Sequence, residues 1–153
     1  MNHKELFYFA GQCLDLGEHS EFRETIISQF SCGVLKLEDF IFLCSNHLVL
    51  PAIYLNFKKF ELLEVFPTEF TEHLEDIYKL NKKRNFEILQ QIDEINSIFK
   101  LENITPVYLK GTANLMDNLY SDLAERMIGD IDLLVQEQDY IKAINLVMGL
   151  GYK

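Results

Sequence analysis

Apolar residues recur at helical spacing through the first two-thirds of the chain. Up to about residue 101 they fall three or four positions apart, which is the spacing of one face of an α-helix. The pattern predicts five helices, at residues 4–16, 21–30, 37–47, 52–59 and 67–101. Gly17 suits the end of the first helix, Ser20 suits the N-cap of the second, and Pro51 suits the first turn of the fourth.

The longest predicted helix has a break in its apolar face. Apolar positions run from Phe70 to Ile77 and resume from Ile88 to Phe99. Between them the same face passes through three polar residues, Asn81, Arg84 and Asn85. Two interpretations are open: a solvated or locally satisfied polar stretch, or a polar window that lines a functional cleft.

The pattern changes after Asn103, where short β-branched and aromatic runs alternate with helical spacing. Four elements are expected there: strands at 105–109 and 130–135, and helices at 113–119 and 139–150. We therefore expect an α+β fold with two domains. Residues 1–101 form a mostly helical region ending in the long helix, and residues 102–153 begin an α/β core with a small mixed sheet.

Two short strands are fewer than the three or so that normally make a stable sheet. Either a further strand completes the sheet, or the chain is the front part of a longer core. An incomplete sheet has an open edge, through which we expect the isolated chain to self-associate.

Composition and charge narrow the classes of function. The 153 residues carry a formal net charge of −10, which argues against general nucleic-acid coating but not against a nucleotide site held by metal ions. The three cysteines lack C-x-x-C spacing, which argues against a disulfide framework and a cysteine zinc site. The start has no leader pattern, and no apolar run approaches about 18 residues. We therefore expect a cytoplasmic protein with no membrane partner.

The strongest chemical signal is the run G-D-I-D-L-L-V at 129–135. Residues two apart in a strand share a face, so Asp130 and Asp132 are expected to project together while the alternating apolar residues face the core. Adjacent carboxylates repel each other unless a divalent cation or water neutralises the repulsion. Two interpretations follow: a Mg²⁺ site suited to phosphoryl or nucleotidyl transfer, or a solvated strand end.

Two further signals lie near this pair in the sequence. In the K-G-T segment (Lys110, Gly111 and Thr112), the glycine lets the backbone approach a ligand, and the threonine suits a helix cap beside anion-attracting N–H groups. A plain turn with a cap is the other interpretation. Arg126 either holds a triphosphate by bidentate contacts or pairs with a neighbouring acidic residue at the surface.

Together these segments resemble the nucleotidyltransferase superfamily, whose core combines a glycine and a small hydroxyl residue with a D-x-D strand. More narrowly, the chain is similar to an uncharacterised bacterial nucleotidyltransferase family with an L-K-G element, a tyrosine and R-x-x-G-D-I-D-L-L-V. The matching residues are Leu109 to Gly111, Tyr120, and Arg126 to Val135, with weaker agreement upstream at Lys83, Arg84 and Asn85.

The resemblance implies a partial nucleotidyltransferase-like core and a set of roles. Asp130 and Asp132 would be catalytic and would bind Mg²⁺, with two ions about 4 Å apart that bridge to the phosphates of an NTP such as ATP. The implied nucleotide-binding residues are Lys110, Gly111, Thr112 and Arg126. The implied reaction moves a nucleoside monophosphate to an unidentified acceptor, which is a protein, a small molecule or a nucleic acid, while pyrophosphate leaves.

One feature departs from the superfamily, which normally adds a third carboxylate on a later strand. Glu137 and Asp139 follow the aspartate pair too closely for that role and are typical of the acidic start of a helix. A second class of function therefore stays open: a non-catalytic nucleotide- or partner-binding module, such as an antitoxin-like protein or a degenerate transferase.

Overall fold

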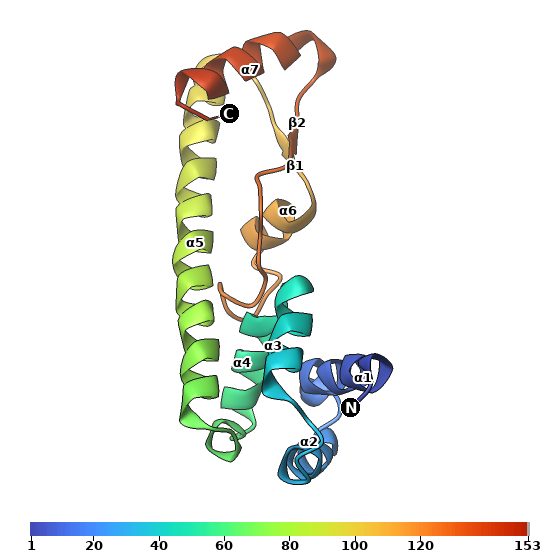
Figure 1. Cartoon of the computed structure of the whole chain (residues 1–153). Coiled ribbons are helices and arrows are strands. Elements are labelled where there is room, and N and C mark those ends of the chain that lie inside the picture. The colour runs from blue at the N-terminus through green and yellow to red at the C-terminus, as the bar shows by residue number, and fades with distance from the viewer. Residues whose placement is uncertain (153) are drawn as a thin grey trace. The chain divides into compact units, whose positions relative to one another are not determined.

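Helices make up most of residues 1–152, and within this described part of the chain one pair of strands forms the sheet, which confirms the expected α+β class. The computed structural model describes residues 1–152. Its helices are α1 (His3–Leu14), α2 (Phe22–Ser31), α3 (Leu37–Asn46), α4 (Leu50–Lys59), α5 (Thr68–Leu101), α6 (Lys110–Met116) and α7 (Tyr140–Gly149) (Figure 1). Short 3-10 turns are η1 (Asp15–Gly17), η2 (Leu63–Val65) and η3 (Glu137–Asp139), and the strands are β1 (Val107–Tyr108) and β2 (Leu133–Leu134).

The chain forms two compact units. The first consists of Met1–Lys82 with Ala124–Met127, and the second of Lys83–Leu123 with Ile128–Lys153. Helix α5 is continuous through the change from one unit to the other, which falls between Lys82 and Lys83. A domain boundary after residue 101 stays a prediction.

The first unit packs around aromatic side chains from its helices. Phe9 and Phe40 are buried and meet edge to face, and Phe57 stacks on Phe66 with ring centroids 4.9 Å apart and planes 9° apart. Offset stacked and edge-to-face pairs stabilise a core beyond the area that they bury. Pro51 lies in the first turn of α4, where its missing N–H costs no helical hydrogen bond.

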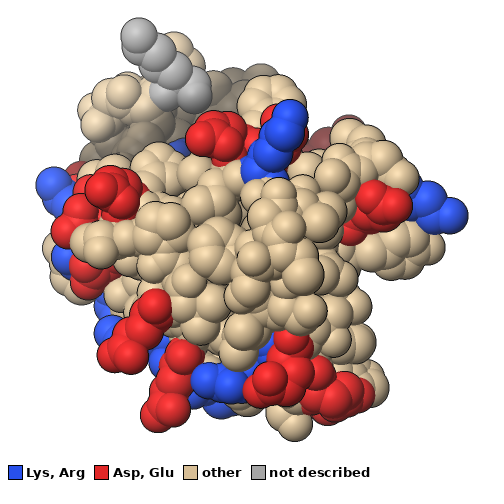
Figure 2. Space-filling view, turned by 60° about the horizontal axis from the view of Figure 1, so that its bottom comes forward, with Lys and Arg blue, Asp and Glu red and all other residues tan. Residues whose placement is uncertain are grey.

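Charged side chains, most of them acidic and some of them Lys or Arg, surround an uncharged area in the view of Figure 2. Within residues 1–152, no single helix is long and apolar enough to cross a membrane. The helices α3 and α4 meet that test only when taken together as a pair bent by 120°.

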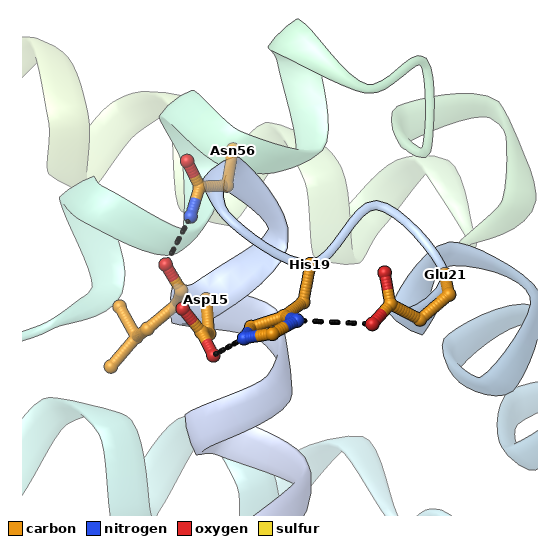
Figure 3. Close-up of polar contacts among 5 residues, drawn as sticks. Asp15, His19, Glu21 and Asn56 are labelled. Atoms are coloured by element: carbon orange, nitrogen blue, oxygen red, sulfur yellow. Dashed lines mark hydrogen bonds and ion pairs between the residues drawn. The ribbon is translucent and has the colours of Figure 1, made fainter.

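His19 lies between two carboxylates at the junction of α1 and α2 (Figure 3). Its Nδ1 is 3.0 Å from Oε1 of Glu21, and its Nε2 is 3.7 Å from Oδ2 of Asp15. The hydrogen bond with Glu21, followed by the charge of Asp15, raises the pKa of His19.

The N-cap of α2 is Glu21, so the prediction that Ser20 caps this helix is wrong. The backbone turns at His19, whose carbonyl oxygen accepts from the N–H of Phe22.

The second unit contains the sheet. Strands β1 and β2 pair antiparallel, with Val107 opposite Leu134 and Tyr108 opposite Leu133. Leu133 of β2 packs on the cluster that contains Phe99 of α5 and Ala143 of α7. Tyr108 of β1 packs on a second cluster, which contains Ile88 and Ile92 of α5. Both strands are shorter than predicted, because regular pairing stops at two residues in each.

Candidate functional site

Helix α6 begins at Lys110, three residues earlier than the pattern predicts. Its N-cap is Leu109, which makes no side-chain capping bond, and Lys110 has φ +52°. The K-G-T segment is therefore the first turn of α6 rather than the loop before it. The prediction that Thr112 caps the helix is wrong, because Thr112 lies inside the helix and is fully buried.

Thr112 contacts the backbone on both sides of Ile131. Its Oγ1 donates to the carbonyl oxygen of Asp130 at 3.2 Å and accepts from the N–H of Asp132 at 3.3 Å. The N–H of Leu109 in turn donates to the carbonyl oxygen of Asp132 at 3.0 Å. These bonds bring the K-G-T segment and the D-I-D segment (Asp130, Ile131 and Asp132) side by side, although the two are 18 or more positions apart in the sequence.

The two aspartates lie just before β2 rather than within it, which corrects the predicted strand at 130–135. The predicted alternation nevertheless holds for the apolar residues, because Ile131, Leu133 and Val135 all pack against one buried cluster of this unit. Asp130 is exposed, and the side chain of Asp132 is 29% exposed.

Lys110 supplies the positive charge nearest to Asp132. Its Nζ lies 3.1 Å from Oδ1 of Asp132, and its side chain is 73% exposed. The ammonium group of Lys110 therefore neutralises the charge of the Asp132 carboxylate, as a bound metal ion would. Because its side chain is largely in water, the pair is of the exposed kind that contributes only modestly to stability.

Gly111 packs closely on Ile128. A Cβ at this position would lie 3.4 Å from Cγ1 of Ile128, which is at the tight end of ordinary van der Waals contact. The absent side chain therefore serves the packing of α6 on the segment before the aspartates. Approach of a ligand to the Gly111 backbone stays a prediction.

The polar window of α5 binds backbone oxygens. In the first unit, Nδ2 of Asn81 donates to the carbonyl oxygens of Ala124 at 2.7 Å and Arg126 at 3.1 Å, and Asn81 is buried. In the second unit, the fully buried Asn85 donates to Leu123 O at 2.6 Å.

Arg84, which is exposed, also belongs to the second unit and donates from Nη2 to Gly129 O at 2.9 Å. The apolar face of α5 is thus interrupted because these three side chains satisfy carbonyl groups far away in sequence. Asn81 and Asn85 are buried, and their hydrogen bonds hold the backbone segments that they contact. The cleft-lining role proposed for all three residues stays a prediction.

Arg126 belongs to the first unit, and its side chain is exposed. Tyr120 belongs to the second unit, where its hydroxyl accepts from Nδ2 of Asn114 at 3.2 Å. Neither the tyrosine's partner nor the two hydrogen bonds of Thr112 could be predicted from the sequence, because they depend on side-chain directions that only the folded chain fixes.

Within the described residues 1–152, no three His, Cys, Asp or Glu side chains are grouped so as to hold a metal ion. The aspartate pair offers two hard oxygen donors. Such a pair suits Mg²⁺, which is commonly bound through one or two carboxylates, with phosphate oxygens and water completing its octahedral shell.

A family model matches most of the chain. Residues 35–153 match the model of a family described as uncharacterised nucleotidyltransferase. No curated protein and no solved structure matches the chain. The matched region includes the K-G-T segment, Arg126 and both aspartates, and it covers well over half of the chain. The chain therefore belongs to this uncharacterised nucleotidyltransferase family.

Proposed function

We propose that the protein transfers a nucleoside monophosphate from an NTP to an acceptor, with Mg²⁺ bound by Asp130 and Asp132. Family membership supports nucleotidyl transfer in general. The dependence on Mg²⁺, the use of an NTP as donor and the assignment of these residues are our own proposal.

The observation that carries the proposal is the contact between the K-G-T and D-I-D segments. Lys110 reaches Asp132 at 3.1 Å, and Thr112 bonds to the backbone of both aspartates. A chain that handles a metal-bound triphosphate needs carboxylates for the metal beside donors for the phosphates. These two segments supply both kinds of group in one unit.

In the proposed reaction, an oxygen or nitrogen of the acceptor attacks the α-phosphorus of the NTP. The bond from that phosphorus to the oxygen bridging to the β-phosphate breaks, pyrophosphate leaves, and the proton of the acceptor passes to water. Bound Mg²⁺ would supply charge neutralisation for the attacking and leaving oxygens.

The side chains have separate tasks in this proposal. Asp130 and Asp132 would hold the metal, and Lys110 would move from Asp132 to a phosphate oxygen. The exposed position of Lys110 supports its task, because a long side chain in water changes partner at little cost.

Thermal unfolding with Mg²⁺ and ATP tests binding. A ligand at 100 times its Kd stabilises the folded state by about 2.7 kcal/mol. At about 2–4 °C per kcal/mol, that corresponds to a rise in Tm of roughly 5–10 °C for a chain of this size. We expect this rise in the wild type, no rise in Asp132→Asn, and a full rise in Asp117→Asn, which changes an exposed aspartate of the same unit.

A transfer assay with α-labelled NTPs tests the chemistry. Label should move to an acceptor fraction with release of pyrophosphate, and Asp130→Asn should abolish both. Equal Tm shifts in the wild type and Asp132→Asn would refute the metal site. A full Tm shift without transfer to protein, small-molecule or nucleic-acid acceptors would favour the non-catalytic binding module.

A further inference from the structure

We infer that Thr112 is a positioning residue, which uses its hydroxyl to hold the two aspartates in place for the metal and does not contact the phosphates. This inference rests on the proposed function, and it assigns Thr112 a different task from the one that the family resemblance implies. It is carried by the burial of Thr112 and by its two hydrogen bonds.

Burial separates the Thr112 hydroxyl from any ligand. The residue has 0% exposed surface. A hydroxyl has one proton to donate, and here that proton goes to the carbonyl oxygen of Asp130. One lone pair accepts from the N–H of Asp132. A phosphate oxygen needs a donor, and Thr112 has no second proton to give.

The bonds act on the backbone that carries both carboxylates. The backbone of Asp132 makes two hydrogen bonds with this segment. Its N–H donates to Oγ1 of Thr112, and its carbonyl oxygen accepts from the N–H of Leu109. The carbonyl of Asp130 is held by Thr112. Loss of the hydroxyl is therefore expected to loosen Asp130 more than Asp132.

The length of these bonds predicts a local effect rather than unfolding. At 3.2 Å for the O–H···O bond and 3.3 Å for the N–H···O bond, both lie just beyond the long end of the usual range for their kind of hydrogen bond. Ile131 between the aspartates also packs against two buried clusters of the unit. The packing keeps the segment folded, and the hydroxyl fixes the orientation of its peptide groups.

The test is the affinity for Mn²⁺ in the absence of nucleotide, because this affinity depends on the two aspartates and not on contacts with phosphates. Thr112→Val keeps the shape of the side chain and removes the hydroxyl, Thr112→Ser keeps the hydroxyl, and Thr105→Val changes an exposed threonine of the same unit as a control. We expect Thr112→Val to weaken Mn²⁺ binding by tenfold or more. Thr112→Ser and Thr105→Val should remain within twofold of the wild type.

Binding of ATP without metal separates the two possible tasks of Thr112. A positioning residue leaves this affinity unchanged in Thr112→Val. Wild-type Mn²⁺ affinity in Thr112→Val, or a loss of metal-free ATP binding in that variant alone, would overturn the inference. Failure of the wild type to bind Mn²⁺ would instead refute the proposed function, and the inference with it.

Folding of the variants is checked by thermal unfolding. If Thr112→Val does not fold, Thr112→Ala makes the same test with a small side chain that suits a helix. Thr112→Ser must keep the metal affinity in every case, so a folded serine variant with tenfold weaker Mn²⁺ binding also overturns the inference.

Discussion

Lys110 combines two unusual properties at one residue. Its φ of +52° lies in the left-handed region, which costs a residue with a side chain on the order of 1–3 kcal/mol in strained cases. Its ammonium group also neutralises Asp132 at 3.1 Å. The turn into α6 therefore places an exposed positive charge beside one of the proposed metal ligands.

Replacing Lys110 is predicted to change metal and nucleotide binding in opposite directions. In Lys110→Met, Mn²⁺ alone no longer has to displace the ammonium from Asp132. Exposed ion pairs are worth about 0.2–1 kcal/mol, so binding should tighten by roughly 1.4- to 5-fold. Binding of ATP with Mg²⁺ should weaken, because a phosphate contact is lost. Isothermal titration calorimetry measures both affinities.

Lys100→Met, an exposed lysine at the end of α5, is the matched control for Lys110→Met and should change neither affinity. Weaker binding of the metal alone in Lys110→Met would contradict the competition between the ammonium and the metal ion.

His19 predicts a pH dependence of stability in the first unit. Its pKa is raised in the folded state, so the protonated form stabilises the fold. This stabilisation is fully present below the unfolded value of about 6.5 and is lost as the pH rises through the folded pKa. Urea unfolding of the wild type should therefore show lower stability at pH 8 than at pH 6.

The His19→Gln variant should show a smaller loss of stability between these two pH values. His73→Gln, at another exposed histidine of the unit, serves as the control and should behave like the wild type. An unchanged pH dependence in His19→Gln would show that the contacts with Asp15 and Glu21 contribute nothing in solution.

At the scale of elements, α5 shows why an amphipathic pattern has a gap. The Asn81 amide is buried and donates to two carbonyl oxygens, those of Ala124 and Arg126, while its own Oδ1 has no hydrogen-bond partner among the described residues. The Asn81 side chain thus satisfies two carbonyl groups of the segment that it binds, while its own oxygen makes no hydrogen bond among the described residues. A hydrophobic residue at this position would pack, but it would not hold the segment.

Substitution of Asn81 should destabilise the first unit, and the loss of stability should be smaller for Asn81→Leu than for Asn81→Asp. Asn81→Leu removes both donated bonds, with an expected cost of about 1–3 kcal/mol. Asn81→Asp should cost more, because it places a buried carboxylate against two carbonyl oxygens. Urea unfolding at pH 7 measures both variants, with Gln90→Leu at an exposed position of α5 as the control. Equal stability of wild type and Asn81→Asp would rule out the hydrogen bonds as described.

At the scale of the whole molecule, the sheet has two strands and apolar residues on its surface. Val107 and Leu134 face each other across the pair and are 58% and 57% exposed. Two-stranded pairs are marginal by themselves, and open edges invite pairing with another chain. The expected self-association of the chain through this sheet therefore remains our prediction.

Light scattering at increasing protein concentration tests self-association. The apparent mass of the wild type should rise, and Leu134→Lys should abolish the rise by placing a charge on the exposed strand. Leu101→Lys, at an exposed apolar residue at the end of α5, should still associate. A wild type that stays monomeric at millimolar concentration would contradict the prediction.

Most helices could be predicted from the sequence because their signals are local. The apolar spacing and the proline at position 51 place α1 to α5 within a few residues of their true bounds. The start of α6 could not be predicted in this way, because Lys110 enters the helix with positive φ, a conformation that local propensity disfavours. The predicted strands are longer than the observed ones for a related reason. Runs of β-branched residues indicate an extended chain, but they do not indicate how many residues pair with a neighbouring strand.

The sequence by itself determined the helical periodicity, the acidic character and the motifs that mark the family, because each of these is written in residue type and spacing. Only the tertiary structure decided what the motif residues touch. Thr112 turned out to bind the backbone of Asp130 and Asp132, and Asn81 the carbonyls of the first unit's 124–127 segment. The physical reason is that hydrogen bonds between distant segments depend on the packing that brings those segments together, and no local pattern encodes that packing.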